Sequence, residues 1–467
     1  MRISRTLLAS TIIAALGGLL FGFDTAVISG TTGALTEVYE LNRPWLGTDG
    51  SKFHELERGG FWLGFTVASA LVGTVIGSLA AGRPADAWGR RTTLIWTAVF
   101  YFTSAVGSAL AWNWASFVAF RLLGGLAVGA ASVVCPMYIA EISPAAVRGR
   151  LVAVQQFNIV LGILLAFLSN DQIARLELGA DTWRWMFGVE AIPAAAFFCL
   201  LFTTPRSPRW LVSQRRLDEA RRVLARLGND PVTVDTEVQA IGASLDLEHH
   251  SLAEPLFQHR YRLPISLAVA IAMFNQLSGI NALMYYAPHI FKMAGAAEGS
   301  ALRQSVIVGL MNLVFTMLAM AVIDRFGRKK LLLVGSIGYI VSLSATAWAF
   351  YTYGTEFTPT GGRIVLASLL VFIASHAFGQ GAVIWVFISE IFPNRVRARG
   401  QALGSFTHWI MAAAISWTFP MIADISGGHT FAFYAAMMVL QLVWVVVWMP
   451  ETKGLPLEEI QRHLHIE

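Results

Sequence analysis

The feature that most constrains the fold is a series of apolar runs, each about 20 residues long, which recur along the whole chain. A run of this length crosses the ~30 Å hydrocarbon core of a bilayer as an α-helix. A membrane β-barrel is not expected, because it needs many alternating segments of about 10 residues. Twelve membrane-spanning helices are predicted, at residues 6–30, 58–81, 92–111, 115–139, 150–170, 183–203, 261–290, 302–323, 331–352, 363–391, 400–422 and 428–449.

The composition of the 467-residue chain agrees with a lipid environment. Hydrophobic residues make up 55% and charged residues 13%, whereas a soluble domain has about 25% charged residues. A soluble protein this apolar would expose large apolar patches. The segment from Arg2 to Phe23 has the order of a signal peptide, but the apolar run continues to Ile28, so we predict a retained first span. Cys135 and Cys199 lie in apolar runs and are expected to be core residues.

The basic residues predict how the chain crosses the membrane. Of the 34 Lys and Arg residues, 25 fall on the side of the N-terminus, eight on the opposite side, and Arg121 inside a span. Basic residues concentrate in cytoplasmic loops. We therefore expect a multi-pass protein of the inner (plasma) membrane with both termini in the cytoplasm. The basic residues form no single surface, so no nucleic-acid partner is expected, and we expect a monomer in the lipid bilayer.

Sequence elements repeat between the two halves of the chain. Residues 81–91, after the second span, resemble residues 323–330, after the eighth. A Glu and an Arg seven residues apart follow both the fourth and the tenth span, as in Glu141 and Arg148. Duplicated halves are typical of transporters that rock around a site near the middle of the membrane.

We therefore predict an all-α polytopic membrane protein of two pseudo-symmetric six-helix halves. The linker between them is rich in Arg, Leu, Ala and Glu from Asp218 to Leu227, which favours short amphipathic helices. The predicted boundaries are 1–203 for the N-terminal half, 204–260 for the cytoplasmic linker, 261–449 for the C-terminal half and 450–467 for a cytoplasmic tail.

Three ionisable residues of the N-terminal half lie inside predicted spans, namely Asp24, Arg121 and Glu190. Ionisable groups at membrane depth are costly and mark function. An arginine keeps a nearby carboxylate ionised, and separation of the two as helices tilt favours protonation. We predict that the triad couples transport to a proton, which Asp24 takes up outside and releases inside. The alternative is a buried ion network that only fixes helix packing.

Several predicted spans carry amide side chains, which suit an uncharged polar ligand such as a sugar. Carboxamides donate and accept hydrogen bonds without a buried charge, and an indole face covers the apolar side of a sugar ring. Gln276 and Asn281 are about 140° apart on a straight helix, but Ser278 and Gly279 between them allow the helix to break. The candidates for sugar contacts are Gln156, Gln276, Asn281, Asn312 and Trp385; each amide has the alternative of joining helices to one another.

Over essentially its full length the chain resembles the sugar-porter family of the major facilitator superfamily. The matching motifs are Gly22 to Gly30, Pro136 to Pro144, Pro205 to Leu211, Gln276 to Asn281 and Pro450 to Gly454. The resemblance extends to the family's bacterial xylose–proton symporters and animal glucose facilitators. It implies the twelve-helix major facilitator fold and a monosaccharide substrate.

The resemblance also implies roles for individual residues. Family symporters have Asp at the position of Asp24, where the facilitators have a neutral amide. The five candidate sugar contacts match the family's sugar contacts. Tyr285 and Tyr286 stand where family members close an outer gate; the alternative is a pair of interfacial aromatic residues.

The sequence departs from the family pattern at five positions. Asn275 replaces the first of two adjacent glutamines, and His408 replaces an amide in the eleventh span. We expect both to belong to the pocket, since a neutral imidazole also donates and accepts hydrogen bonds; the alternative for His408 is packing against a neighbouring helix. Ala382 replaces a proline in the tenth span, Ala87 an arginine in the first repeated loop, and Arg206 a glutamate.

Charged residues on the predicted cytoplasmic side form a candidate latch, which would hold the inner side closed when the outer side is open. Exposed pairs contribute only ~0–1 kcal/mol each, so the alternative is a set of solvated ion pairs. The predicted latch residues are Asp86, Arg90, Arg91, Glu141, Arg148, Asp324, Arg328, Glu390 and Arg397.

The leading hypothesis is a secondary active transporter that imports a pentose or hexose with a proton by alternating access. The main alternative is a sugar facilitator with a purely structural triad. Efflux of drugs or organic ions is a third hypothesis, which the amide-rich pocket disfavours. A membrane enzyme is not expected, because the sequence shows no metal-ligand cluster, phosphate loop or nucleophile–base pair. No cofactor or metal is expected.

Overall fold

The computed structural model describes residues 4–41, 60–144, 147–228, 231–251, 255–354, 356–393, 396–453, 459–460, 464 and 466, with backbone alone at 231–232, 246–251 and 324. Within these residues the regular structure is helical. Helices occupy all twelve predicted spans. The expectation of a polytopic all-α protein is therefore confirmed.

The first six predicted spans contain six long helical segments. Two of them are interrupted: α1 continues into a short 3-10 turn at Ile28–Gly30, and the sixth span is divided at Val189 and Glu190. The bounds are α1 Arg5–Val27, α4 Phe61–Ala80, α6 Arg90–Ala109, α7 Trp114–Ile142, α8 Arg148–Ala174, α9 Thr182–Gly188 and α10 Ala191–Leu201, with short helices α2 Thr32–Val38 and α5 Gly82–Ala87.

The last six predicted spans are also helical. The seventh breaks between α14 and α15, and the tenth contains a π-helical turn at Ala377–Gly381. The bounds are α14 Arg262–Leu277, α15 Ile280–Met293, α16 Glu298–Phe326, α17 Arg328–Tyr353, α18 Pro359–His376, α19 Ala382–Ile391, α20 Arg397–Ala423 and α21 Gly427–Val447.

Ten segments of the described chain are long and apolar enough to cross a membrane. The two other predicted spans are α6 and α20, which are more polar. In α6 the buried hydroxyls of Thr93 and Thr97 donate to backbone carbonyls four residues earlier, so neither is left without a hydrogen-bond partner. The chain is thus a multi-pass membrane protein.

The predicted linker forms three helices, α11 Pro208–Ser213, α12 Leu217–Arg226 and α13 Pro231–Ser251. Their apolar faces share a small core that includes Trp210, Leu224 and Val238. Arg221 of α12 donates to Asp235 of α13 at 2.7 Å and to Asp218 at 2.8 Å, and these hydrogen bonds raise the pKa of its guanidinium. The expectation of short amphipathic helices is met by α12, whereas α13 is longer than expected, at 21 residues.

Contacts between Cα atoms divide the chain into two units. Unit 1 holds residues 1–24, 73–163 and 187–254, and unit 2 holds residues 25–72, 164–186 and 255–467. The boundaries between these units differ from the predicted domain boundaries at residues 203 and 260, so the predicted domains stay a prediction.

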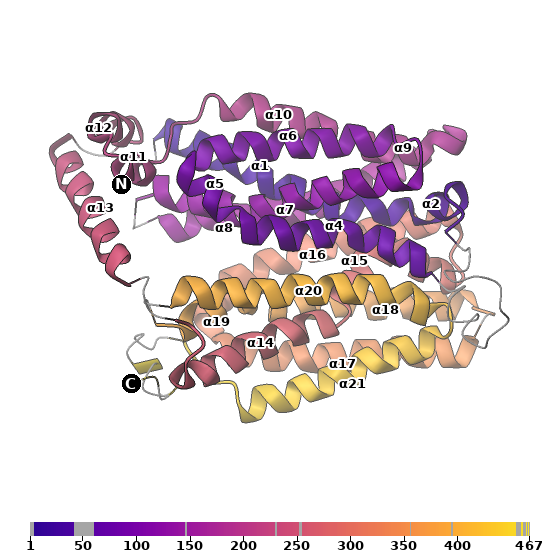
Figure 1. Cartoon of the computed structure of the whole chain (residues 1–467). Coiled ribbons are helices and arrows are strands. Elements are labelled where there is room, and N and C mark those ends of the chain that lie inside the picture. Colours follow the sequence, from indigo (N-terminus) through magenta and orange to yellow (C-terminus); the bar gives the residue numbers. More distant parts are fainter. Residues whose placement is uncertain are drawn as a thin grey trace. The chain divides into compact units, whose positions relative to one another are not determined.

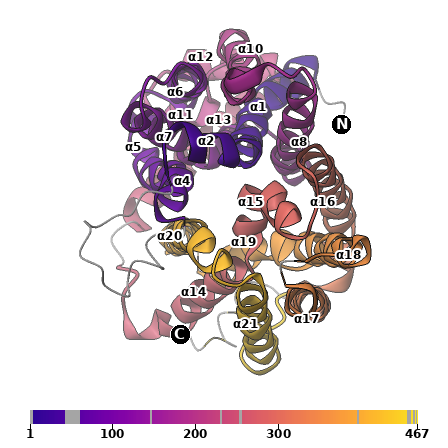
Figure 2. The same ribbon diagram turned by 90° about the vertical axis from the view of Figure 1, so that its right-hand side faces the viewer.

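Each unit has its own helical packing. In unit 1, α6 and α7 run side by side (Figure 1), and glycines bring helices close: a Cβ at Gly129 of α7 would overlap the carbonyl of Thr74 of α4. In unit 2, α17 lies between α18 and α21, as the view along the helices shows (Figure 2). Small residues let the backbones approach, as in other membrane helices.

Candidate functional site

The charged triad predicted in unit 1 contains a buried ion pair. Arg121 of α7 donates from Nη1 to Oδ1 of Asp24 on α1 at 2.5 Å and from Nη2 to Oδ2 at 3.3 Å. Only 1% of the Arg121 side chain and 4% of the Asp24 side chain are exposed. Nη2 also lies 3.3 Å from the Asp24 carbonyl oxygen. A charge-assisted fork of this kind holds the carboxylate in one position.

Glu190 completes the triad at the break between α9 and α10. Its side chain is buried, and its charge interacts with those of Asp24 and Arg121. Within the described part of the chain, its Oε1 atom has no hydrogen-bond partner. Arg121 also lies over the ring of Phe187, 5.4 Å from its centroid. The site therefore contains two carboxylates and one guanidinium. If one carboxylate is protonated, the positive charge of Arg121 can neutralise the negative charge of the other.

The amides predicted in the seventh span meet at a helix break in unit 2. Helix α14 ends at Leu277 and α15 begins at Ile280, and Gly279 between them has left-handed backbone angles (φ 85°, ψ 14°). Asn281 donates from Nδ2 to Oε1 of Gln276 at 2.7 Å. The break that the sequence predicts is therefore present, and it brings together two amides that a straight helix would separate.

Three further predicted residues adjoin these amides. Gln276 donates to Oδ1 of Asn275 at 2.9 Å, and its Nε2 lies 3.2 and 3.3 Å from the two ring nitrogens of His408 on α20. The ring centroids of His408 and Trp385 of α19 are 5.0 Å apart. The resulting cluster of amides, imidazole and indole offers donors, acceptors and an apolar face, which is the chemistry a sugar ring requires.

Two predicted sugar contacts are not joined to this cluster by a described hydrogen bond. Asn312 of α16 is buried, and its Oδ1 accepts from Thr316 at 3.4 Å. Gln156 of α8 is half-buried and belongs to unit 1. The roles of both residues stay predictions.

The predicted gate residues are buried in unit 2. Tyr286 donates from its hydroxyl to the Ser416 carbonyl of α20 at 2.9 Å, and its ring packs on Phe419 with centroids 5.1 Å apart. Its backbone is not helical (φ −124°, ψ 17°), so α15 has a second irregular point. Tyr285 is also buried. The gating role of both residues stays a prediction.

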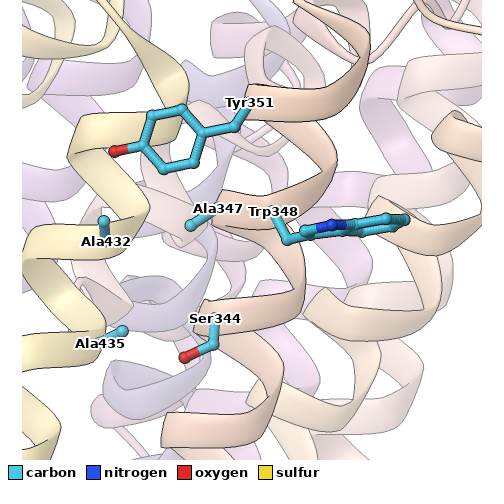
Figure 3. A pocket seen from close by; sticks show the side chains of 6 residues that line it. All are labelled: Ser344, Ala347, Trp348, Tyr351, Ala432 and Ala435. Carbon is cyan, nitrogen blue, oxygen red and sulfur yellow. The ribbon is translucent and has the colours of Figure 1, made fainter.

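A hollow of about 290 Å³ lies elsewhere in unit 2, between α17 and α21 (Figure 3). Tyr351 extends across it toward α21, and Trp348 points away along the side of α17 (Figure 3). Both aromatic side chains are about half exposed. None of the predicted sugar contacts lines this hollow, so it is distinct from the polar cluster.

The predicted latch residues of unit 1 form an arginine–carboxylate cluster. Arg90 at the start of α6 contacts Glu141 of α7 at 2.9 Å and Asp86 of α5 at 3.0 Å. The Ser207 hydroxyl donates to the second oxygen of Glu141 at 2.5 Å. Arg91 donates to the carbonyl of Leu201, the last residue of α10.

The same cluster recurs in unit 2. Arg328 at the start of α17 contacts Glu390 of α19 at 2.8 Å, and the Thr452 hydroxyl donates to the second oxygen of Glu390 at 2.6 Å. Gly89 and Gly327, which precede the two arginines, both have φ of 90°. The two hydroxyls were not among the predicted site residues, although Ser207 and Thr452 each stand two positions after a proline.

The arginines seven residues after Glu141 and Glu390 bind backbone carbonyls, although the spacing suggests ion pairs with these glutamates. Arg148 donates to the Ser143 carbonyl at 3.4 Å, and Arg397 to the Phe392 carbonyl at 3.3 Å, five residues earlier in both cases. The described ion pairs thus join neighbouring helices within each unit. Asp324 lies outside the residues whose side chains are described. The latch across the two halves stays a prediction.

The departures from the family pattern have local consequences. In unit 2, the Glu451 carboxylate accepts from the backbone N–H groups of Arg328 and Lys329 and so caps α17. In unit 1 the corresponding residue is Arg206, which lies over the Trp210 ring at 5.6 Å. Ala382 follows a π-helical turn, so the tenth span continues as a helix where a proline would remove a backbone donor.

The chain is similar to known transporters over nearly its whole length. Residues 10–464 match the family described as Sugar (and other) transporter. The chain is 39% identical to the D-xylose-proton symporter of Escherichia coli (strain K12), over 97% of this chain and 94% of the relative. It is 35% identical to the Arabinose-proton symporter of Bacillus subtilis (strain 168), over 96% of this chain and 93% of the relative.

The same likeness holds for a solved structure. The inward-open conformation of the xylose transporter XylE from E. coli matches with a TM-score of 0.85 and 38% identity, covering 98% of this chain and 99% of that chain. The predicted fold of twelve helices in two six-helix halves is thereby confirmed.

Proposed function

We propose that this chain, which belongs to the Sugar (and other) transporter family, imports a pentose or hexose together with a proton by alternating access. The relatives named above are proton symporters of xylose and arabinose. The two polar sites described above supply a separate place for each substrate, with the proton site in unit 1 and the sugar cluster in unit 2.

The observation that carries proton coupling is the buried pair of Asp24 and Arg121. A carboxylate that is 4% exposed and held by one arginine has no water to solvate its charge. Its protonation breaks the pair and frees Arg121 for Glu190. A side-chain exchange of this kind links proton binding to the packing of α1 against α7.

The sugar is assigned to the polar cluster of Gln276, Asn281, Asn275, His408 and Trp385. The amides and imidazole present both donors and acceptors, and the indole covers an apolar ring face. We add Asn312 of α16 as a contact in unit 2, on the family resemblance, while Gln156 of α8 belongs to unit 1 and its sugar contact stays a prediction.

A transporter that works by alternating access needs a gate on each side of the membrane, and we assign the remaining predicted residues to these gates. Tyr285 and Tyr286 close the outer side, where Tyr286 already binds the α20 backbone. The arginine–carboxylate clusters of Glu141 and Glu390 act on the inner side. The excess of basic residues, 25 against eight, supports an inner-membrane protein with both termini in the cytoplasm.

Asp24→Asn tests this proposal. Moving one charge across 100 mV is worth ~2.3 kcal/mol, or about fifty-fold accumulation of sugar from the potential alone. In proteoliposomes with an imposed proton gradient, the parent should accumulate labelled sugar, whereas Asp24→Asn should only exchange it. Asp171→Asn is a matched control, because Asp171 is also a buried carboxylate paired with an arginine, Arg175 at 2.6 Å.

Undiminished accumulation by Asp24→Asn would leave the triad a packing element and favour a facilitator. Equal loss of accumulation in Asp171→Asn would show that neutralising any buried carboxylate abolishes accumulation. The proposed role of Asp24 as the proton carrier would then be contradicted.

A further inference from the structure

Tyr101 of α6 is a buried polar residue that the triad does not include. Its side chain is fully buried, and its hydroxyl has no hydrogen-bond partner among the described residues. Buried hydroxyls are normally paired, so an unpaired one requires an explanation. A phenylalanine would fill the same space without leaving a polar atom unsatisfied.

The face of α6 that carries Tyr101 lies against the proton site. Ser104 is one helical turn after Tyr101, and it shares this face. A Cβ built on Gly124 of α7 would overlap the Ser104 hydroxyl and lie 3.3 Å from Oδ1 of Asp24. The Ser104 side chain and the Asp24 carboxylate thus meet over the same glycine.

The Tyr101 side chain lies within electrostatic range of both carboxylates. The charges of Asp24 and Glu190 both act on Tyr101, and the Cys135 thiol of α7 is its third titratable neighbour. Arg121, from α7, pairs with Asp24 in this arrangement. Helix α6 packs against both α7 and α10, so the unpartnered Tyr101 hydroxyl and the unpartnered Oε1 of Glu190 lie in one buried region of unit 1.

We propose that Tyr101 is a positioning residue of the proton site, which bridges Asp24 and Glu190 when the site is loaded with its proton. Protonated Asp24, released from Arg121, donates its new O–H to the Tyr101 oxygen. Tyr101 keeps its own proton and donates it to Oε1 of Glu190, whose charge Arg121 then balances. No covalent bond changes except the O–H that Asp24 gains from the outer solution and later loses to the inner one. This inference rests on the proposed proton coupling.

The bridge stabilises the protonated form of the site, so its removal should weaken proton binding. Tyr101→Phe removes both hydrogen bonds of the bridge from that form, so the site should bind its proton about tenfold more weakly. In proteoliposomes, the outer pH of half-maximal uphill sugar uptake should fall by about one unit. Sugar exchange at neutral pH should be unchanged, because it does not require the proton, and it reports that the variant is folded.

Ser108→Ala is the matched control. Ser108 lies on the same face of α6, two turns beyond Tyr101, and it is also buried with no hydrogen-bond partner for its hydroxyl in the described chain. A general effect of removing an unsatisfied hydroxyl would shift both pH profiles, whereas the bridge predicts a shift for Tyr101→Phe alone.

The outcomes separate this inference from the function on which it rests. Failure of the parent to accumulate sugar in response to a proton gradient would overturn both. Accumulation by the parent with coincident pH profiles for the parent and Tyr101→Phe would overturn the bridge and leave proton coupling intact. A shift toward higher pH would also contradict the bridge, since it would mean that Tyr101 favours the ionised site.

Discussion

Gln276 joins three other polar side chains of the proposed sugar cluster. It accepts from Asn281, donates to Asn275 and lies beside both ring nitrogens of His408. Its amide is fully buried, so every partner that it loses leaves a polar group unsatisfied.

Gln276→Ala should weaken sugar binding about 10- to 100-fold, because an unpaired polar group costs ~1–3 kcal/mol. Equilibrium binding of labelled sugar to purified protein measures this change. Gln441→Ala is the control: Gln441 of α21 is a buried amide that donates to Ser336 at 2.9 Å, outside the cluster. Equal loss of affinity in both variants would show a general effect of removing a buried amide and would contradict the assigned site.

The sequence alone predicts those functional residues whose side chains are unusual inside a membrane. Charges such as Asp24 stand out in an apolar run whatever the fold around them. Tyr101 and Ser207 do not stand out, because a tyrosine in a span or a serine in a linker is ordinary. Their significance depends on neighbours more than 60 residues away in the chain, as with Ser207 and Glu141.

Among the elements, the break between α14 and α15 is the one on which the sugar cluster depends. Gly279 holds left-handed angles there, and a Cβ at this position would lie 2.8 Å from the Tyr434 ring. A residue with a side chain pays about 1–2 kcal/mol for that backbone conformation.

Gly279→Ala should therefore displace Asn281 from Gln276, lower the melting temperature and weaken sugar binding. Thermal unfolding and sugar binding, measured on one preparation, test this expectation. Gly354→Ala is the control, since Gly354 also has a positive φ (56°) but no atom within 4 Å of its Cβ position. Normal sugar affinity in Gly279→Ala would show that the break does not position the amides.

The helical elements follow closely from the sequence, because a lipid environment leaves a backbone few choices. The interruptions within these helices are harder to predict from the sequence. Ser278 and Gly279 signal one break, and Pro193 favours the interruption at Val189 and Glu190, because a proline ring clashes with the carbonyl four residues earlier. The π-helical turn at Ala377–Gly381 lies where two helices pack closely, with Gly379 against Gly335, and this contact between distant segments cannot be read from the local sequence.

At the scale of the whole molecule, the chain has the major facilitator fold and carries one polar site in each unit. The repeated motifs end in two equivalent clusters, in which an arginine, a glutamate and a hydroxyl meet. The sequence repeats predict the arginines and glutamates. The partners could not be predicted from spacing, because each glutamate pairs with an arginine of another helix and not with the arginine seven residues on.

The central claim is that sugar and proton enter together. Its most direct measurement is the pH outside proteoliposomes when unlabelled xylose or another pentose or hexose is added with no gradient imposed. Proton-coupled import predicts an immediate sugar-dependent rise of the outer pH with the parent and none with Asp24→Asn, although both exchange sugar. Sugar entry with the parent at constant outer pH would contradict proton coupling and make the protein a facilitator.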